Sequence, residues 1–145
     1  MKVFVAHNVT HHVKGTAKGA MLERLLSRLR GAGVDVCDPE ETVIPHHAYA
    51  ARFDYCLREI SGADVLVVEA SARVGLGVGA EMMFAKDRHI GVFAICPPDS
   101  YYRKTLPARP DGVSEWVHPF IHGLATKIFT SVDECVSELS SGRRP

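Results

Sequence analysis

An acidic residue follows a glycine-rich stretch near the middle of the chain. The segment GLGVGAE ends at Glu81, and its glycines are Gly75, Gly77 and Gly79. Glycines let a backbone come close to a ligand, and the free N–H groups at the start of a helix bind anions. We expect Glu81 in the first turn of the helix that follows. There its carboxylate either complements the helix dipole or acts on a bound ligand.

This glycine pattern differs from the fingerprint of dinucleotide-binding proteins. That fingerprint reads GxGxxG and follows the first strand, whereas GLGVGAE follows the third strand that we expect. We therefore reject a nicotinamide dinucleotide site of the classical kind.

A second polar segment, HNVTHHVKGT, begins at His7, directly after the first apolar run of the chain. Histidine changes its charge near neutral pH, so His7 could donate a proton to a departing base as a general acid. Asn8 is a candidate to bind the substrate. His11, His12 and Lys14 could hold an anionic group, although a solvated loop explains them equally well.

The cysteines and histidines do not form a recognisable metal motif. The four cysteines contain no CxxC pair, and the pairs His11-His12 and His46-His47 lack the i, i+4 spacing of helical metal ligands. Buried thiols explain the cysteines better than a disulfide framework does. We expect no metal and no cofactor.

Strands and helices alternate along the chain. Apolar runs predict strands over 2–6, 34–37, 63–69, 90–96 and 126–129. Amphipathic spacing predicts helices over 17–30 and 48–61, a third through 81–85, and a last one capped by Ser131 with Glu134. In the helix over 48–61, the apolar face carries Phe53, Cys56, Leu57 and Ile60.

This alternation predicts one α/β domain over residues 1–145. We expect a doubly wound, flavodoxin-like or Rossmann-like fold with a five-stranded parallel sheet in the order 2-1-3-4-5. Ligands of such sheets bind beyond the carboxyl ends of the strands where the order reverses, so the loops 7–16 and 70–79 meet there. The stretch 99–123 is the least regular, and its Trp116 could stack on a base, contact a subunit or cover an edge of the sheet.

Charge and hydropathy exclude several classes of partner. Lys plus Arg number 17 and Asp plus Glu number 17, so the net charge is zero and no basic field collects a nucleic-acid polymer or a membrane surface. The apolar runs are far shorter than the ~20 residues of a membrane helix, and the amino terminus leads directly into a strand pattern. We expect a cytoplasmic protein.

The run DYCLREISGADVLVVEASARVGLGVGAEMMFAKDRHIGVFAI resembles the nucleoside 2-deoxyribosyltransferase superfamily. The resemblance is greatest to its small members, which hydrolyse the N-glycosidic bond of nucleoside monophosphates. The similar features are Ala63-Asp64 at the start of a strand, the acidic Glu69 at its end, the Gly-Val-Gly turn and Glu81. The resemblance implies that Glu81 is the nucleophile, because a carboxylate stabilises or traps the sugar cation that forms when the glycosidic bond breaks. It also implies a small nucleoside or nucleotide substrate and a homodimer or larger assembly, in which a neighbour's loop often completes the site.

The sequence departs from the superfamily at three helper positions. Cys56 stands where an Asp is usual, and Asp54, two residues earlier, could take over. Gly75 stands where a Ser or Asp is usual, so Ser71 or Arg73 could reach the site instead.

The third departure is Phe4, which stands where the first strand usually has a tyrosine.

Two functional hypotheses follow: an enzyme that hydrolyses or transfers at the N-glycosidic bond, and a catalytically silent nucleotide-binding module. A third reading, an assembly unit, rests on the Trp116 segment. The candidate catalytic residues are Glu81, Asp54 and His7. The candidate substrate-binding residues are Phe4, Asn8, Ser71, Gly75, Gly77, Gly79 and Trp116.

Overall fold

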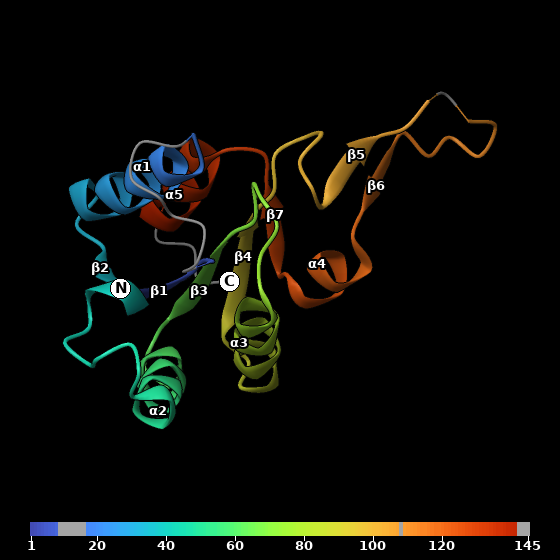
Figure 1. Cartoon of the computed structure of the whole chain (residues 1–145). Coiled ribbons are helices and arrows are strands. Elements are labelled where there is room, and N and C mark those ends of the chain that lie inside the picture. The colour runs from blue at the N-terminus through green and yellow to red at the C-terminus, as the bar shows by residue number, and fades with distance from the viewer. Residues whose placement is uncertain (9–16, 108, 142–145) are drawn as a thin grey trace.

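Five strands pair in parallel into one sheet in this computed structural model, which describes residues 1–8, 17–107 and 109–141 (Figure 1). The strands are β1 (Lys2–Ala6), β2 (Asp35–Cys37), β3 (Val65–Glu69), β4 (Gly91–Ile95) and β7 (Lys127–Phe129). Their order is β2-β1-β3-β4-β7, which confirms the predicted order with β7 as the fifth strand. Central strands β1, β3 and β4 are almost wholly apolar because helices cover both of their faces.

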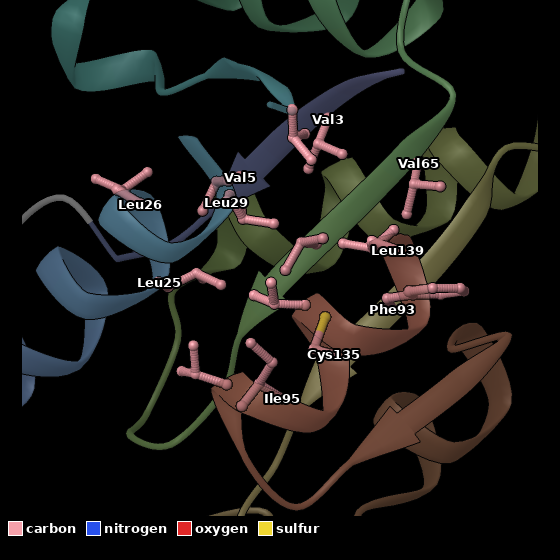
Figure 2. Packing of buried hydrophobic residues seen from close by; sticks show 14 of the residues in the cluster. Val3, Val5, Leu25, Leu26, Leu29, Val65, Phe93, Ile95, Cys135 and Leu139 are labelled. Atoms are coloured by element: carbon pink, nitrogen blue, oxygen red, sulfur yellow. The ribbon is translucent and has the colours of Figure 1, made fainter. Parts of the chain in front are cut away.

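Helices lie on both faces of the sheet, as a doubly wound fold requires (Figure 1). Helices α1 (Ala17–Gly31) and α5 (Val132–Ser140) pack together on one face, and α2 (Tyr49–Ser61), α3 (Leu76–Asp87) and α4 (Pro119–Leu124) cover the other. Because side chains alternate along a strand, Val3 and Val5 enter the first core while Phe4 and Ala6 enter the second. Figure 2 shows the first core, in which Leu25 and Leu29 from α1 and Leu139 from α5 surround the sheet.

The third helix begins earlier than the sequence predicts. It starts at Leu76, with Gly75 as its N-cap residue, so Glu81 is its sixth residue and lies in the second turn. Our placement of Glu81 in the first turn is therefore wrong. Buried Val78, Met82 and Ala85 anchor this helix to the sheet, and their packing outweighs the low helix propensity of the glycines. Since the dipole effect fades beyond the first turn, it does not account for Glu81.

The set of buried side chains in helix α2 also differs from the prediction. Ile60 is buried as expected, but Phe53 is 61% exposed. Tyr49, one turn earlier on the same side, is 79% exposed. The helix therefore packs through its carboxyl-terminal part and presents two aromatic rings to the surface.

The irregular stretch 99–123 contains a small antiparallel hairpin of β5 (Arg103–Thr105) and β6 (Glu115–Val117) that extends away from the sheet (Figure 1). We did not predict these strands. The capping box of α5 is confirmed: Glu134 N donates to Ser131 Oγ at 3.2 Å, and Thr130 N donates to the Glu134 carboxylate at 2.8 Å. Within the described ranges, no helix has the length and hydropathy to cross a membrane.

Candidate functional site

The strand order reverses between β1 and β3, whose neighbours β2 and β4 lie on opposite sides. Ala6 of β1 pairs with Val68 of β3, so both strands end at the same edge of the sheet. His7 leaves the end of β1 there, and Glu69 closes β3. A ligand of this fold class binds beyond this edge.

Glu81 is the most perturbed carboxyl group of this region. Its side chain is half-buried in α3, and burial raises its pKa to about 7 although the charge of His7 and a hydrogen bond from Cys56 act in the opposite direction. At neutral pH this carboxyl group therefore exists in both its charged and its neutral form. Such a strongly shifted group near the strand ends where ligands of this fold class bind is a functional-site candidate.

Cys56 faces Glu81 from the neighbouring helix. Its thiol acts on the Glu81 carboxyl group, and α2 packs against α3. Burial, followed by the charge of Glu81, raises the pKa of the thiol to about 11. The position where the resemblance places an acid thus holds a neutral thiol in contact with the candidate nucleophile.

His7, whose charge acts on Glu81, forms a buried pair with Asp38. His7 Nε2 lies 2.9 Å from Asp38 Oδ1, and the two residues are 4% and 7% exposed. Asp38 caps the short helix η2 (Pro39–Glu41) by accepting a hydrogen bond from Glu40 N at 2.9 Å. Burial alone would raise the pKa of Asp38, but the bonds from His7 and Glu40 hold it below its usual value. Asp38 is therefore ionised and fixes the imidazole ring.

Three hydrogen bonds fix the loop between β3 and α3. Asn8 Nδ2 donates to the Arg73 carbonyl oxygen at 3.2 Å, which joins this loop to the end of β1. On its other side, the Val74 N–H donates to the Tyr102 hydroxyl at 3.0 Å. Near the strand end, Ser71 N donates to the buried Glu69 carboxyl group at 2.9 Å. The loop that precedes the helix of Glu81 is thus held from three directions.

The glycines before Glu81 border open space. At Gly75, Gly77 and Gly79, none of the described residues places an atom within 4 Å of the position that a Cβ would take. Gly77 lies four residues before Glu81 and therefore on the same side of α3. This side of the helix leaves room for a ligand beside the carboxyl group.

The structure brings only some of the predicted site residues together. Glu81 and His7 act on one another, and Asn8 joins the loop that carries Ser71. Phe4 is completely buried in the core, so it does not face the crevice. Asp54 is exposed, and two residues of helix place it about 200° around α2 from Cys56.

Trp116 lies in the hairpin, with its ring 5.8 Å from His118, in a row of aromatic rings that includes Tyr102. His11, His12 and Lys14 lie outside the described residues. We did not single out Asp38, and we interpreted Cys56 only as a missing acid. The signal for Asp38 is its place directly after β2, since Cys37 pairs with Phe4 and the ends of β2 and β1 lie side by side.

No protein-family model matches the sequence, and no curated protein matches it. Among solved structures, a 2-deoxyribosyltransferase from Leishmania mexicana superimposes with a TM-score of 0.67, covers 98% of both chains and is 12% identical. The chain has the fold of the nucleoside 2-deoxyribosyltransferases. The enzyme of this name from Bacillus psychrosaccharolyticus gives a TM-score of 0.66 at 12% identity, covering 94% of this chain and 90% of that one. The CMP N-glycosidase BcmB of Clostridium botulinum gives 0.57 at 13% identity, with coverage of 96% and 98%. These likenesses establish the deoxyribosyltransferase fold over the whole domain and agree with the superfamily resemblance of the sequence.

Proposed function

We propose that this protein cleaves or transfers at the N-glycosidic bond of a nucleoside or nucleoside monophosphate, with Glu81 as the nucleophile. The observation that carries this proposal is the Glu81 carboxyl group itself, whose pKa burial raises to about 7 and on which both His7, at the end of β1, and Cys56, on α2, act. None of the ion pairs found among the described residues involves Glu81, and the helix dipole does not account for a carboxyl group in the second turn of α3.

The reaction has two steps. In the first, the bond between the anomeric carbon and the base nitrogen breaks, its electrons leave with the base, and a Glu81 oxygen bonds to the anomeric carbon. In the second, water or another base attacks the anomeric carbon and releases the Glu81 carboxylate. Water gives a hydrolase and a second base gives a transferase.

The buried His7–Asp38 pair supports the ionised nucleophile in this proposal. The charge of His7 lowers the pKa of Glu81 from the value that burial alone would give, which favours the carboxylate that must attack. Asp38 holds the ring in place from 2.9 Å. Proton donation by His7 to the base, which the sequence suggests, is not part of this proposal, because Nε2 is engaged with Asp38 and Nδ1 is buried.

We also propose that the protein assembles as a homodimer or larger. Tyr49 and Phe53 on α2 share one exposed side, and Leu76 and Met83 on α3 share another, in the layer that these two helices form together. Substituting Phe53→Glu should shift the mass measured by light scattering toward a monomer. Val43→Glu, an exposed apolar residue outside the helices, is the matched control. The cytoplasmic location expected from the sequence stays a prediction.

The test of the activity is chromatographic detection of free base. The protein is incubated with nucleosides and their monophosphates, with and without an acceptor base, beside Glu81→Gln and the exposed control Glu23→Gln. Release or exchange that disappears only in Glu81→Gln supports the proposal. Equal release by Glu81→Gln overturns the role of Glu81. If no substrate reacts but calorimetry detects nucleotide binding, the silent binding module is the better description.

A further inference from the structure

A neutral base needs a proton when it leaves, and this site is poorly equipped to supply one. When the bond to a neutral base breaks, the base nitrogen gains negative charge, and a positioned acid must supply a proton. A base that is already cationic, such as a pyridinium ring, takes up the bond electrons and leaves neutral. It needs no acid.

The first possible proton donor is Cys56, because its thiol is the group in contact with Glu81. Burial and the Glu81 charge raise the pKa of this thiol to about 11, so it holds its proton and is a weak acid at neutral pH. Tyr55 lies next to it on α2, but its hydroxyl is engaged with Cys37 Sγ at 3.4 Å. That hydrogen bond, together with burial, raises the pKa of Tyr55 above its ordinary value.

The second possible donor is His7, whose ring is only 4% exposed. Its Nε2 is committed to Asp38 at 2.9 Å, and its Nδ1 is buried, so neither nitrogen is presented to a ligand. Asp54, the acid that could replace Cys56, is exposed on another side of α2. Thus no acid among these candidates is placed to protonate a departing base.

The charges around Glu81 favour a cation. Glu81 becomes a carboxylate near neutral pH, and the charge of His7 that acts on it is offset by the ionised Asp38, 2.9 Å from the imidazole ring. Arg52 acts on Cys56 from α2, but it is paired with Glu40 at 2.7 Å. A positive charge on the ligand would stabilise the Glu81 carboxylate that burial disfavours.

From these contacts we propose that the site acts on nucleosides whose base is positively charged before the bond breaks, of the N-ribosyl pyridinium class. This inference rests on the proposed function and specifies its substrate. A Glu81 oxygen bonds to the anomeric carbon while the electrons of the carbon–nitrogen bond pass to the ring nitrogen, which leaves as a neutral pyridine. Water then attacks the anomeric carbon and frees Glu81, and one proton is released to solvent in each turnover.

The experiment compares two substrate classes on the whole protein. Nicotinamide riboside and its 5′-monophosphate represent the cationic class, and cytidine, inosine and their monophosphates represent the neutral class. Free base is measured by chromatography and proton release by a pH indicator. Since a positioned general acid contributes about 10²-fold or more, kcat/KM for the cationic class should exceed that for the neutral class by about 10²-fold.

A variant pair at Cys56 sharpens the comparison. Cys56→Asp restores an acid beside Glu81 and should raise the rate of release of neutral bases at least about tenfold, whereas Cys56→Asn, matched in size, should not. Both variants are first checked for folding by circular dichroism. If they do not fold, the inference is tested by the comparison of the two substrate classes on the unaltered protein alone.

Two results would overturn the inference in different ways. If the unaltered protein releases neutral bases as fast as nicotinamide and Glu81→Gln abolishes both activities, the proposed function stands and the cationic substrate class is wrong. If no base is released from either class, the proposed function fails, and the inference fails with it.

Discussion

Replacing the half-buried carboxyl group of Glu81 by an amide should stabilise the protein in a pH-dependent way. The pKa of Glu81 is raised from 4.5 to about 7, with burial as the largest cause. At about 1.36 kcal/mol for each pKa unit, ionising this group in the folded chain costs at most about 3 kcal/mol relative to the unfolded chain. Glutamine has the same shape and no charge to desolvate.

The sign of the effect follows from proton binding. Below pH 4.5 the carboxyl group is protonated in both the folded and the unfolded chain, so the substitution changes little. Between pH 4.5 and about 7 only the unfolded chain is ionised, and the stability of the unaltered protein falls as the pH rises. Above that range the full cost is present, and Glu81→Gln is at its greatest advantage.

Urea unfolding of both proteins at pH 4, 6 and 8 measures this difference. The gain in the free energy of unfolding should be near zero at pH 4 and reach about 2–3 kcal/mol at pH 8. Glu23→Gln, an exposed site on α1, is the matched control and should show no such trend. A gain that is the same at every pH, or a loss of stability at pH 8, would refute the burial of Glu81 as the cause of its shifted pKa.

Three further outcomes are expected. First, kcat/KM should rise about tenfold for each pH unit below about 7 and level off above it, because the nucleophile must be ionised; a flat profile from pH 5 to 8 would contradict this. Second, Gly77→Ala should stabilise α3 by about 0.5–1 kcal/mol and yet weaken substrate binding, since the added methyl lies on the side of Glu81. The control Gly31→Ala, in the last turn of α1, should give a higher Tm without loss of binding in calorimetry. Third, Asp38→Asn should lower the stability in urea by about 1.5–3 kcal/mol, because it removes the charged partner of a buried hydrogen bond. It should also lower kcat more than it raises KM, since it acts through His7, and an unchanged kcat in the folded variant would rule out this positioning role.

Much of the fold could be predicted because its central strands carry a strong signal. Strands β3 and β4 are buried at every position, so they appear in the sequence as continuous apolar runs. The hairpin carries no such signal: β5 (RKT) and β6 (EWV) each span three residues, contain charged side chains and pair with each other outside the main sheet. Their pairing depends on contacts such as Arg103–Glu115 at 2.8 Å, which link residues far apart in the chain.

The candidate site was predictable where a residue directly follows a strong strand or a glycine-rich turn. His7 and Glu81 satisfy this condition, and the structure couples their charges. Asp38 follows β2, a strand of only three residues, and precedes a proline, so in the sequence it appears as part of a loop. Its partnership with His7 depends on the parallel register of β2 with β1, which no local pattern specifies.

Several features that lower the stability of the folded chain lie together at the start of α3. The first turns of α3 contain two glycines, an apolar residue that is 93% exposed, Leu76, and the desolvated carboxyl group of Glu81. Each of these lowers stability on its own, whereas the other end of the helix packs through Met82 and Ala85 in the ordinary way. A ligand that covers the glycines and offers a positive charge to the carboxylate would offset these costs at once, because whatever binds only the folded state stabilises it. Under the proposed function, the destabilised end of α3 is therefore the part of the fold that a substrate would complete.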